Sequence, residues 1–164
     1  MQKMIFTITV LFSGLVAGLM FSYSCSVNLG LHNLTDIEYI KTMQTINIEI
    51  QNIYFFMVFI GLLLLLPTST WLSYSLNKKV AFYFILIATL FYFVGVFGVT
   101  ILGNVTLNNQ LSKINLANTS EETLSTFRNH FESNWTKYHL IRTLASIVSF
   151  LLTILAFQKT THSI

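Results

Sequence analysis

The sequence predicts an all-α protein whose four long helices form a transmembrane bundle. Two features of the composition lead to this fold class. Only 9% of the 164 residues are charged and 54% are apolar, whereas a soluble domain has about 25% charged residues. The charges are also grouped, which leaves four gaps that are long enough, or nearly so, to cross a bilayer: residues 4–35, 50–77, 80–112 and 143–158. We therefore expect a single membrane domain over residues 1–164.

The first two helices are expected at about residues 4–31 and 37–76. The first apolar run continues into MFSYSCSV, so it is longer than the roughly 7–15 apolar residues of a cleaved signal peptide. We expect this helix to be retained. The second helix follows the polar connection HNLTDIEY, in which Thr35 or Asp36 is suited to cap its N-terminus.

The third and fourth helices are expected at about residues 79–111 and 120–157. Thr119 and Ser120 stand before two glutamates, which is a typical helix start. At ~1.5 Å per residue these helices are longer than the ~30 Å hydrocarbon core requires. We expect helices two and four to extend beyond the membrane on its non-cytoplasmic side.

Small residues recur at close spacing in the first and third helices. Such residues allow helix backbones to approach closely in a membrane. We expect a packing role, and no chemical role, for Gly14, Gly18, Ser22, Gly95 and Gly98.

The basic residues predict the orientation of the chain. The net charge is +3, but several lysines stand at the ends or connections of apolar segments, as the positive-inside rule describes. We therefore expect both termini and the SLNKKV turn in the cytoplasm, in a bacterial inner membrane, and we expect no binding to nucleic acid. The lysines concerned are Lys3, Lys78, Lys79 and Lys159.

Polar side chains follow one face of each of three helices. The fourth helix carries Trp135, His139 and Arg142 on successive turns of one face. Amides and a guanidinium that faced lipid would be costly, so we expect the three faces to meet in a polar chamber toward the non-cytoplasmic end. The other two faces consist of Thr100, Asn104 and Asn108, and of Gln44, Asn47, Gln51 and Tyr54.

A purely structural interpretation stays open at this point. Asn and Gln between membrane helices often only hold the helices together, at ~0.6 kcal/mol per hydrogen bond. His139 and Arg142 could also extend toward the aqueous interface. For Arg142, the candidate partners are Glu49 and the side-chain carbonyls of Asn104 or Asn108, and we favour the amides because Glu49 lies off the polar face of its helix.

Four motifs, MQTIN with IQNIYF, GNVTLNNQL, and WTKYHLIRTLAS, resemble those of the anthrone oxygenase family of small four-helix membrane proteins. The resemblance covers nearly the whole chain, from Gly14 to Ser146, and Thr106 stands where the family more usually has proline. It implies an oxygenase that needs neither metal nor flavin and acts on an electron-rich polycyclic phenol. The matching site residues are Gln44, Asn47, Asn104, Asn108, Trp135, His139 and Arg142.

The chemistry of these residue types suits that reaction. His139 titrates near neutral pH and is the candidate base, with Arg142 as the candidate group that holds a phenolate or peroxide anion. Trp135 would stack on a flat ring, and the amides would orient hydroxyl and carbonyl groups. We expect no metal site, because the chain has no H-E-x-x-H or paired E-x-x-H spacing. A haem held by His139 is a weaker alternative.

The main alternative function is non-catalytic. The same chamber would then hold a quinone, a lipid or a partner helix without converting it. The expected partners are thus a small aromatic or quinone-like ligand and the lipid bilayer, and a homo-oligomer stays open. The single cysteine excludes an internal disulfide.

Overall fold

The computed structural model describes residues 2–161, and this part of the chain contains helices and no strands. Four helical segments are long and apolar enough to cross a membrane: 2–32, 53–75, 79–111 and 121–160. The predicted all-α fold with four membrane-type helices is therefore confirmed, and the chain has the character of an integral membrane protein. The elements are α1 (Gln2–Ser22), η1 (Tyr23–Val27), α2 (Asn28–His32), α3 (Asp36–Glu49), α4 (Ile53–Ser75), α5 (Lys79–Leu90), η2 (Phe91–Gly98), η3 (Thr100–Val105), α6 (Thr106–Leu111) and α7 (Glu121–Thr161).

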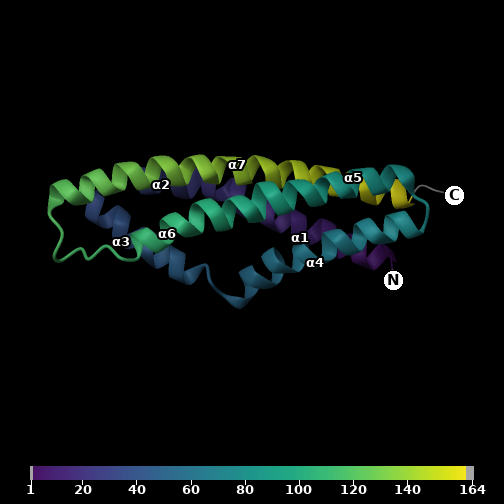
Figure 1. The fold of residues 1–164 in the computed structure, drawn as a ribbon, viewed down its shortest axis with the longest axis horizontal. Helices are drawn as coiled ribbons and strands as arrows, with labels where there is room; N and C mark the ends of the chain where they lie inside the picture. The colour runs from purple at the N-terminus through teal and green to yellow at the C-terminus, as the bar shows by residue number, and fades with distance from the viewer. Residues whose placement is uncertain (1, 162–164) are drawn as a thin grey trace.

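The second predicted helix, residues 37–76, is wrong as a continuous element. It is divided into α3 and α4, and the chain bends visibly between them (Figure 1). Asn52 causes the break, because its side chain accepts a hydrogen bond from the Phe55 amide at 3.1 Å and donates one to the Glu49 carbonyl at 2.8 Å. An asparagine that bonds to its own backbone neighbours in this way competes with the helix and caps the next one.

The first and third helices run without interruption, but each contains π-helical turns. The turn η1 connects α1 to α2, and η2 and η3 occupy the middle of the third helix. A π-helical turn holds an extra residue, so it changes which side chains face a neighbour, and such turns are frequent at functional sites. The bounds of the third helix, 79–111, are those predicted.

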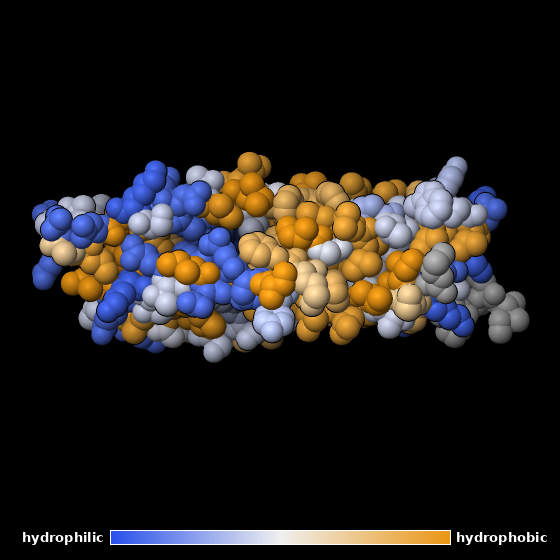
Figure 2. All heavy atoms as spheres, turned by 90° about the horizontal axis from the view of Figure 1, so that it is seen from below, coloured by the Kyte–Doolittle hydropathy of each residue, from blue (hydrophilic) through white to orange (hydrophobic). Residues whose placement is uncertain are grey.

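The helix α7 runs along the whole length of the bundle (Figure 1). Its 41 residues form one element that packs against α1, α5, η2 and η3 (Figure 1). At ~1.5 Å per residue it is about 60 Å long, which is twice the thickness of a hydrocarbon core. A helix of this length is not covered by the hydrocarbon core at every point. In agreement, one end of the molecule has a mainly hydrophilic surface, whereas the surface of the middle is mainly hydrophobic (Figure 2).

Arg128 holds the hydrophilic end together. Its guanidinium donates to the carbonyls of Leu34 and His32 at 2.7 and 2.9 Å, and to Asp36 at 2.8 Å. It also bonds to Glu132 at 3.2 Å, one turn along α7. These bonds tie α7 to the connection between α2 and α3.

The N-terminus of α3 carries the expected cap. Thr35 is the N-cap residue, and its backbone N–H and hydroxyl donate to the Glu38 carboxylate at 3.0 and 2.7 Å. These hydrogen bonds hold the pKa of Glu38 below its ordinary value. The choice left open between Thr35 and Asp36 is therefore settled in favour of Thr35.

The apolar core has two parts. One part lies toward the N-terminus of α1 and the C-terminus of α7, and it includes Phe6, Leu66 and Ile85. The other part lies toward the hydrophilic end of the molecule and includes Met43 and Phe131. The candidate site described below lies between them.

The glycines that were expected to allow close packing differ in their surroundings. A Cβ atom on Gly95 would lie 2.6 Å from the Cβ of Ala145 on α7, and one on Gly14 would lie 3.1 Å from the Phe150 ring. A Cβ on Gly18 would meet nothing within 4 Å. Close packing is therefore observed at Gly95 and Gly14 but not at Gly18.

We expect Gly95→Ala to destabilise the protein, because overpacking typically costs about 1–3 kcal/mol. Gly18→Ala is the matched control, and it should be neutral or stabilising by up to about 1 kcal/mol because alanine is the better helix former. Thermal unfolding of both variants in detergent measures the difference. Equal stability of the two variants would contradict the packing described here.

Candidate functional site

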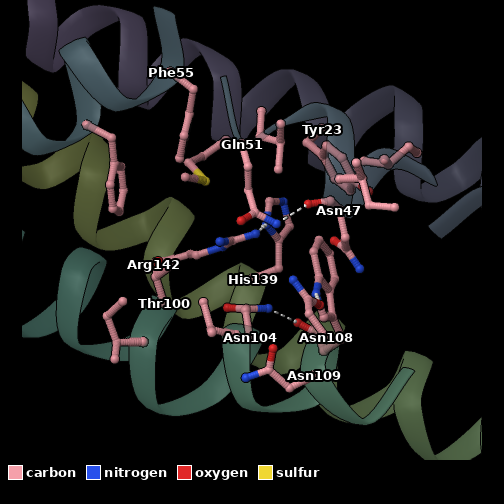
Figure 3. A pocket seen from close by; sticks show the side chains of 18 of the residues that line it. Tyr23, Asn47, Gln51, Phe55, Thr100, Asn104, Asn108, Asn109, His139 and Arg142 are labelled. Carbon is pink, nitrogen blue, oxygen red and sulfur yellow. Dashed lines mark hydrogen bonds between the residues drawn. The ribbon is translucent and has the colours of Figure 1, made fainter. Parts of the chain in front are cut away.

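A cavity of about 680 Å³ lies between the helices, and all seven predicted site residues line it. Figure 3 shows the side chains of Asn104, Asn108, His139 and Arg142 converging with those of Tyr23 and Asn47. Apolar walls come from Phe55, Phe59 and Phe97 and from several isoleucines. The polar faces of the second, third and fourth helices thus meet at one place, as expected, although Tyr54 does not take part and is 76% exposed.

Trp135 is held in position by both asparagines of the third helix. Its indole Nε1 donates to Asn108 Oδ1 at 2.9 Å, and its backbone carbonyl accepts from Asn104 Nδ2 at 3.1 Å. The rings of Trp135 and His139 stack, with centroids 5.0 Å apart and an interplanar angle of 15°. One face of the indole is therefore already covered by His139, which limits the predicted stacking of a ligand to the rest of its surface.

His139 and Arg142 form a directly bonded pair. The guanidinium approaches His139 Nδ1 with Nε at 3.2 Å and Nη2 at 3.0 Å. Because arginine has donors only, Nδ1 must accept, so this ring is neutral and carries its proton on Nε2. The lone pair that a base would use is occupied by Arg142 in this state.

Within the part of the chain that the structure describes, Arg142 has no carboxylate partner. The ion pairs between residues 2 and 161 join His32 to Glu132 and Arg128 to Asp36 and Glu132, and none includes Arg142. Glu49, one candidate partner, is therefore not its partner, and the side-chain carbonyls of Asn104 and Asn108 do not accept from it either. No Asp, Glu or Lys lines the cavity, so the guanidinium is its fixed charge. Its Cζ lies 5.1 Å from the centroid of the Trp135 ring.

Two buried amide atoms of residues that line the cavity have no hydrogen-bond partner within residues 2–161. They are Asn47 Nδ2, a donor, and Asn104 Oδ1, an acceptor. Buried polar atoms are nearly always paired in proteins. A polar ligand in the cavity would give both atoms a partner only after the two side chains turn toward it.

Gln44 differs from Asn47 although the two are one turn apart on α3. Its Nε2 donates to the backbone carbonyls of Leu111 and Ile114 at 2.9 and 3.1 Å. These bonds tie α3 to the end of α6. The amide donors that were expected to orient a ligand are thus used to join two helices.

Two site residues on the first helix were missed by the sequence reading. The Tyr23 ring lies 5.3 Å from the Trp135 ring and 5.2 Å from the His139 ring, centroid to centroid. Ser24 Oγ lies 2.9 Å from His139 Nε2. The polar run SYSCS within an apolar helix was the available signal. Gln51 and Phe55, on either side of the helix break, also line the cavity.

His32 and His130 do not line the cavity. His32 pairs with Glu132 at 2.8 Å at the hydrophilic end, and His130 is exposed on α7. Within residues 2–161, no three His, Cys, Asp or Glu side chains lie close enough together to hold a metal ion.

The cavity offers groups that would suit a flat aromatic molecule that bears oxygen atoms. The aromatic walls suit its ring system, and the guanidinium suits an anionic oxygen in a site of low polarity. The unpaired amide atoms suit a further hydroxyl and carbonyl. His139 can accept a proton only when Arg142 has moved away from Nδ1.

Residues 53–152 match the family model described as Anthrone oxygenase, which is more than half of the chain. The matched region begins at the start of α4 and includes Asn104, Asn108, Trp135, His139 and Arg142. The residues that η1 and α3 contribute to the cavity lie outside it. No curated protein and no solved structure matches the chain.

The different bonding of Gln44 and Asn47 leads to opposite expectations for stability. Gln44→Leu removes two hydrogen bonds, one to the last residue of α6 and one to the connection after it, and should lower the free energy of unfolding by about 1 kcal/mol or more. Asn47→Leu removes an unpaired buried donor and should leave that free energy unchanged or raise it. Thermal unfolding in detergent compares them. An equal loss in both variants would mean that Asn47 also has a structural partner.

Proposed function

Because the chain belongs to the anthrone oxygenase family, we propose that it is a membrane-embedded enzyme that oxidises an electron-rich, fused-ring phenol with molecular oxygen, without a metal or flavin. The observation that carries the proposal is the cavity around Arg142. It combines aromatic walls with a guanidinium that has no carboxylate partner. Such a site favours a flat ligand in its phenolate form.

Binding uses three kinds of group. The ring system lies against the aromatic walls, and its acidic oxygen approaches Arg142. Asn47 Nδ2 and Asn104 Oδ1 are both inaccessible as they stand, so each side chain first turns toward the ligand. Asn47 Nδ2 then donates to a carbonyl or ether oxygen of the ligand, and Asn104 Oδ1 accepts from a second hydroxyl, so that both unpaired atoms gain a partner. Asn108 and Gln44 act indirectly, by holding Trp135 and the α3–α6 contact.

The first chemical step is a proton transfer. The phenol hydroxyl enters between Arg142 and His139, and the guanidinium leaves Nδ1 to bond to the phenol oxygen. Nδ1 then takes the phenol proton, which leaves an imidazolium and a phenolate. Arg142 stabilises the phenolate by charge-assisted hydrogen bonds.

The oxidation follows from the electron-rich anion. The phenolate passes one electron to O₂, and the resulting superoxide combines with the ring radical at the C–H carbon para to the oxygen. The imidazolium of His139 returns its proton to the outer peroxide oxygen. Loss of the C–H proton and cleavage of the O–O bond then release water and leave a quinone carbonyl. One O₂ is consumed and one water is formed for each quinone.

A non-catalytic binding protein is the second candidate. The observation that favours it is that Arg142 occupies the Nδ1 lone pair of His139. If the guanidinium never leaves, the cavity has no base and only holds its ligand, a quinone, a lipid or a partner helix.

The proposal includes an orientation in the membrane. We place the ends of α1 and α7 and the α4–α5 turn in the cytoplasm of a bacterium, and the hydrophilic end of the molecule on the opposite side of the inner membrane. Support comes from Lys3 near the start of α1, Lys78 in the α4–α5 turn and Lys159 near the end of α7. The start of α1, this turn and the end of α7 lie at the same end of the bundle (Figure 1). The cavity then opens in the half of the molecule that is distant from the cytoplasm.

Arg142→Gln tests the catalytic role. Purified protein in detergent is given a hydroxylated anthrone and O₂, and quinone absorbance and O₂ uptake are recorded. We expect turnover by the unmodified protein and a loss of about 10²-fold or more in Arg142→Gln, as for removal of a donor to a developing anion. Lys137→Gln removes one positive charge from an exposed position of α7 and should retain full activity.

Two results would contradict this function. Tight binding of the anthrone without conversion by the unmodified protein would favour the binding protein. Equal activity of Arg142→Gln and Lys137→Gln would show that the guanidinium does not act on the anion.

Labelling tests the orientation. Cys25 is exposed, so it is first replaced by serine. Single cysteines at Asn77 and Ser120 are then treated with a membrane-impermeant maleimide in right-side-out and inverted vesicles. We expect Asn77→Cys to react only in inverted vesicles and Ser120→Cys only in right-side-out ones; reaction of both from one side would overturn the topology.

A further inference from the structure

Ser24 connects the first helix to His139, which lines the cavity. It lies in η1, where the π-helical turn places Tyr23 and Ser24 beside α7. Its hydroxyl oxygen is 2.9 Å from His139 Nε2, and it donates its hydrogen to the Met20 carbonyl at 3.1 Å. A serine hydroxyl has one hydrogen, so while it donates to Met20 it can only accept from His139.

The second hydroxyl near His139 has the same restriction. Thr143 Oγ1 lies 3.5 Å from Nε2 and donates its hydrogen to the His139 carbonyl at 2.7 Å. It also lies 3.4 Å from Ser24 Oγ, which is too long for a strong bond. Both hydroxyls therefore present acceptors to Nε2, and Ser24 is the closer one.

The two sides of the ring thus require the same tautomer. On one side Arg142 donates to Nδ1, and on the other Ser24 accepts from Nε2–H. While Arg142 stays on Nδ1, either contact alone would fix the proton on Nε2. Once Arg142 turns to an anionic ligand, only the Nε2 side keeps the tautomer, where the Met20 carbonyl is a further acceptor for His139 beside Ser24.

We propose that Ser24 is a positioning residue: by accepting from Nε2–H, it keeps the Nδ1 lone pair of His139 open to the cavity after Arg142 has left. The catalytic meaning rests on the proposed function, since an open lone pair matters if His139 takes a proton from the ligand. The effect of Ser24 on the tautomer of His139 does not depend on any substrate. Histidine bases commonly depend on a partner of this kind at the second ring nitrogen.

The tautomer is measured by ¹⁵N NMR with ring-labelled histidine. The chain has four histidines, and the His139 signals are those that disappear in His139→Gln. The measurement is made at alkaline pH, where imidazole is neutral, in Arg142→Met, which removes the donors to Nδ1. We expect Nε2 to be protonated and Nδ1 unprotonated in Arg142→Met, and a mixture of both tautomers in Arg142→Met combined with Ser24→Ala.

Matched variants separate positioning from folding. Ser26 is exposed in the same π-helical turn, so Ser26→Ala in the Arg142→Met background should leave the His139 signals unchanged. Ser24→Thr keeps a hydroxyl and should restore the single tautomer. If Arg142→Met shows the same His139 signals with Ser24 and with Ser24→Ala, the proposal is overturned. It is also overturned if Ser24→Thr, in the same background and with a normal unfolding temperature, does not restore the signals of the single tautomer.

The kinetic readout uses Ser24→Ala alone, with Arg142 intact. Loss of a residue that orients a catalytic histidine costs about tenfold or more in rate. We expect kcat for the hydroxylated anthrone to fall by about that factor and KM to change less than twofold, because Ser24 does not line the cavity. If the unmodified protein converts no anthrone, the proposed function fails, whereas the NMR result still decides the role of Ser24.

Discussion

A guanidinium inside an apolar helix bundle must be satisfied by other groups of the protein, and much of the cavity follows from this constraint on Arg142. The guanidinium cannot lose its charge at accessible pH, and lipid offers it no acceptor. It bonds to His139, which is thereby neutral and protonated on Nε2. The histidine in turn needs an acceptor on its other side, and Ser24 supplies one. The arginine therefore determines the state of a ring that the first helix completes.

The positions of the apolar helices could be predicted from the sequence because their signal is long and local. The third helix has the predicted bounds, and the predicted fourth helix corresponds to one continuous element. The break between α3 and α4 could not be predicted from periodicity, because Gln51 continues the polar face and only the two hydrogen bonds of Asn52 end the helix. An asparagine can either continue a helix or cap the next one, and the sequence around Asn52 does not show which of the two it does.

The sequence predicted which residues line the cavity better than it predicted what each of them bonds to. Periodicity identifies which side chains share a helix face, and the seven residues do line one cavity. It does not identify what each side chain bonds to across the bundle. Gln44 joins α3 to α6, and Asn104 and Asn108 hold Trp135, because carbonyls and an indole from distant parts of the chain happen to lie within reach. Tyr23 and Ser24 were missed since a π-helical turn presents them, and no sequence period describes such a turn.

The uninterrupted helix α7 has a consequence for its own rotation. Arg128 fixes it at the hydrophilic end through the carbonyls of His32 and Leu34, and Trp135 fixes it at the cavity through Asn108. A turn of the helix about its axis by one residue, ~100°, would break both sets of bonds together. Apolar side chains of similar size would tolerate several rotational settings, whereas these directional bonds admit one. The rotation of α7 about its axis is thus fixed at two points along its length. The side chains of His139 and Arg142 therefore keep the same direction into the cavity, independently of the lipid around the bundle.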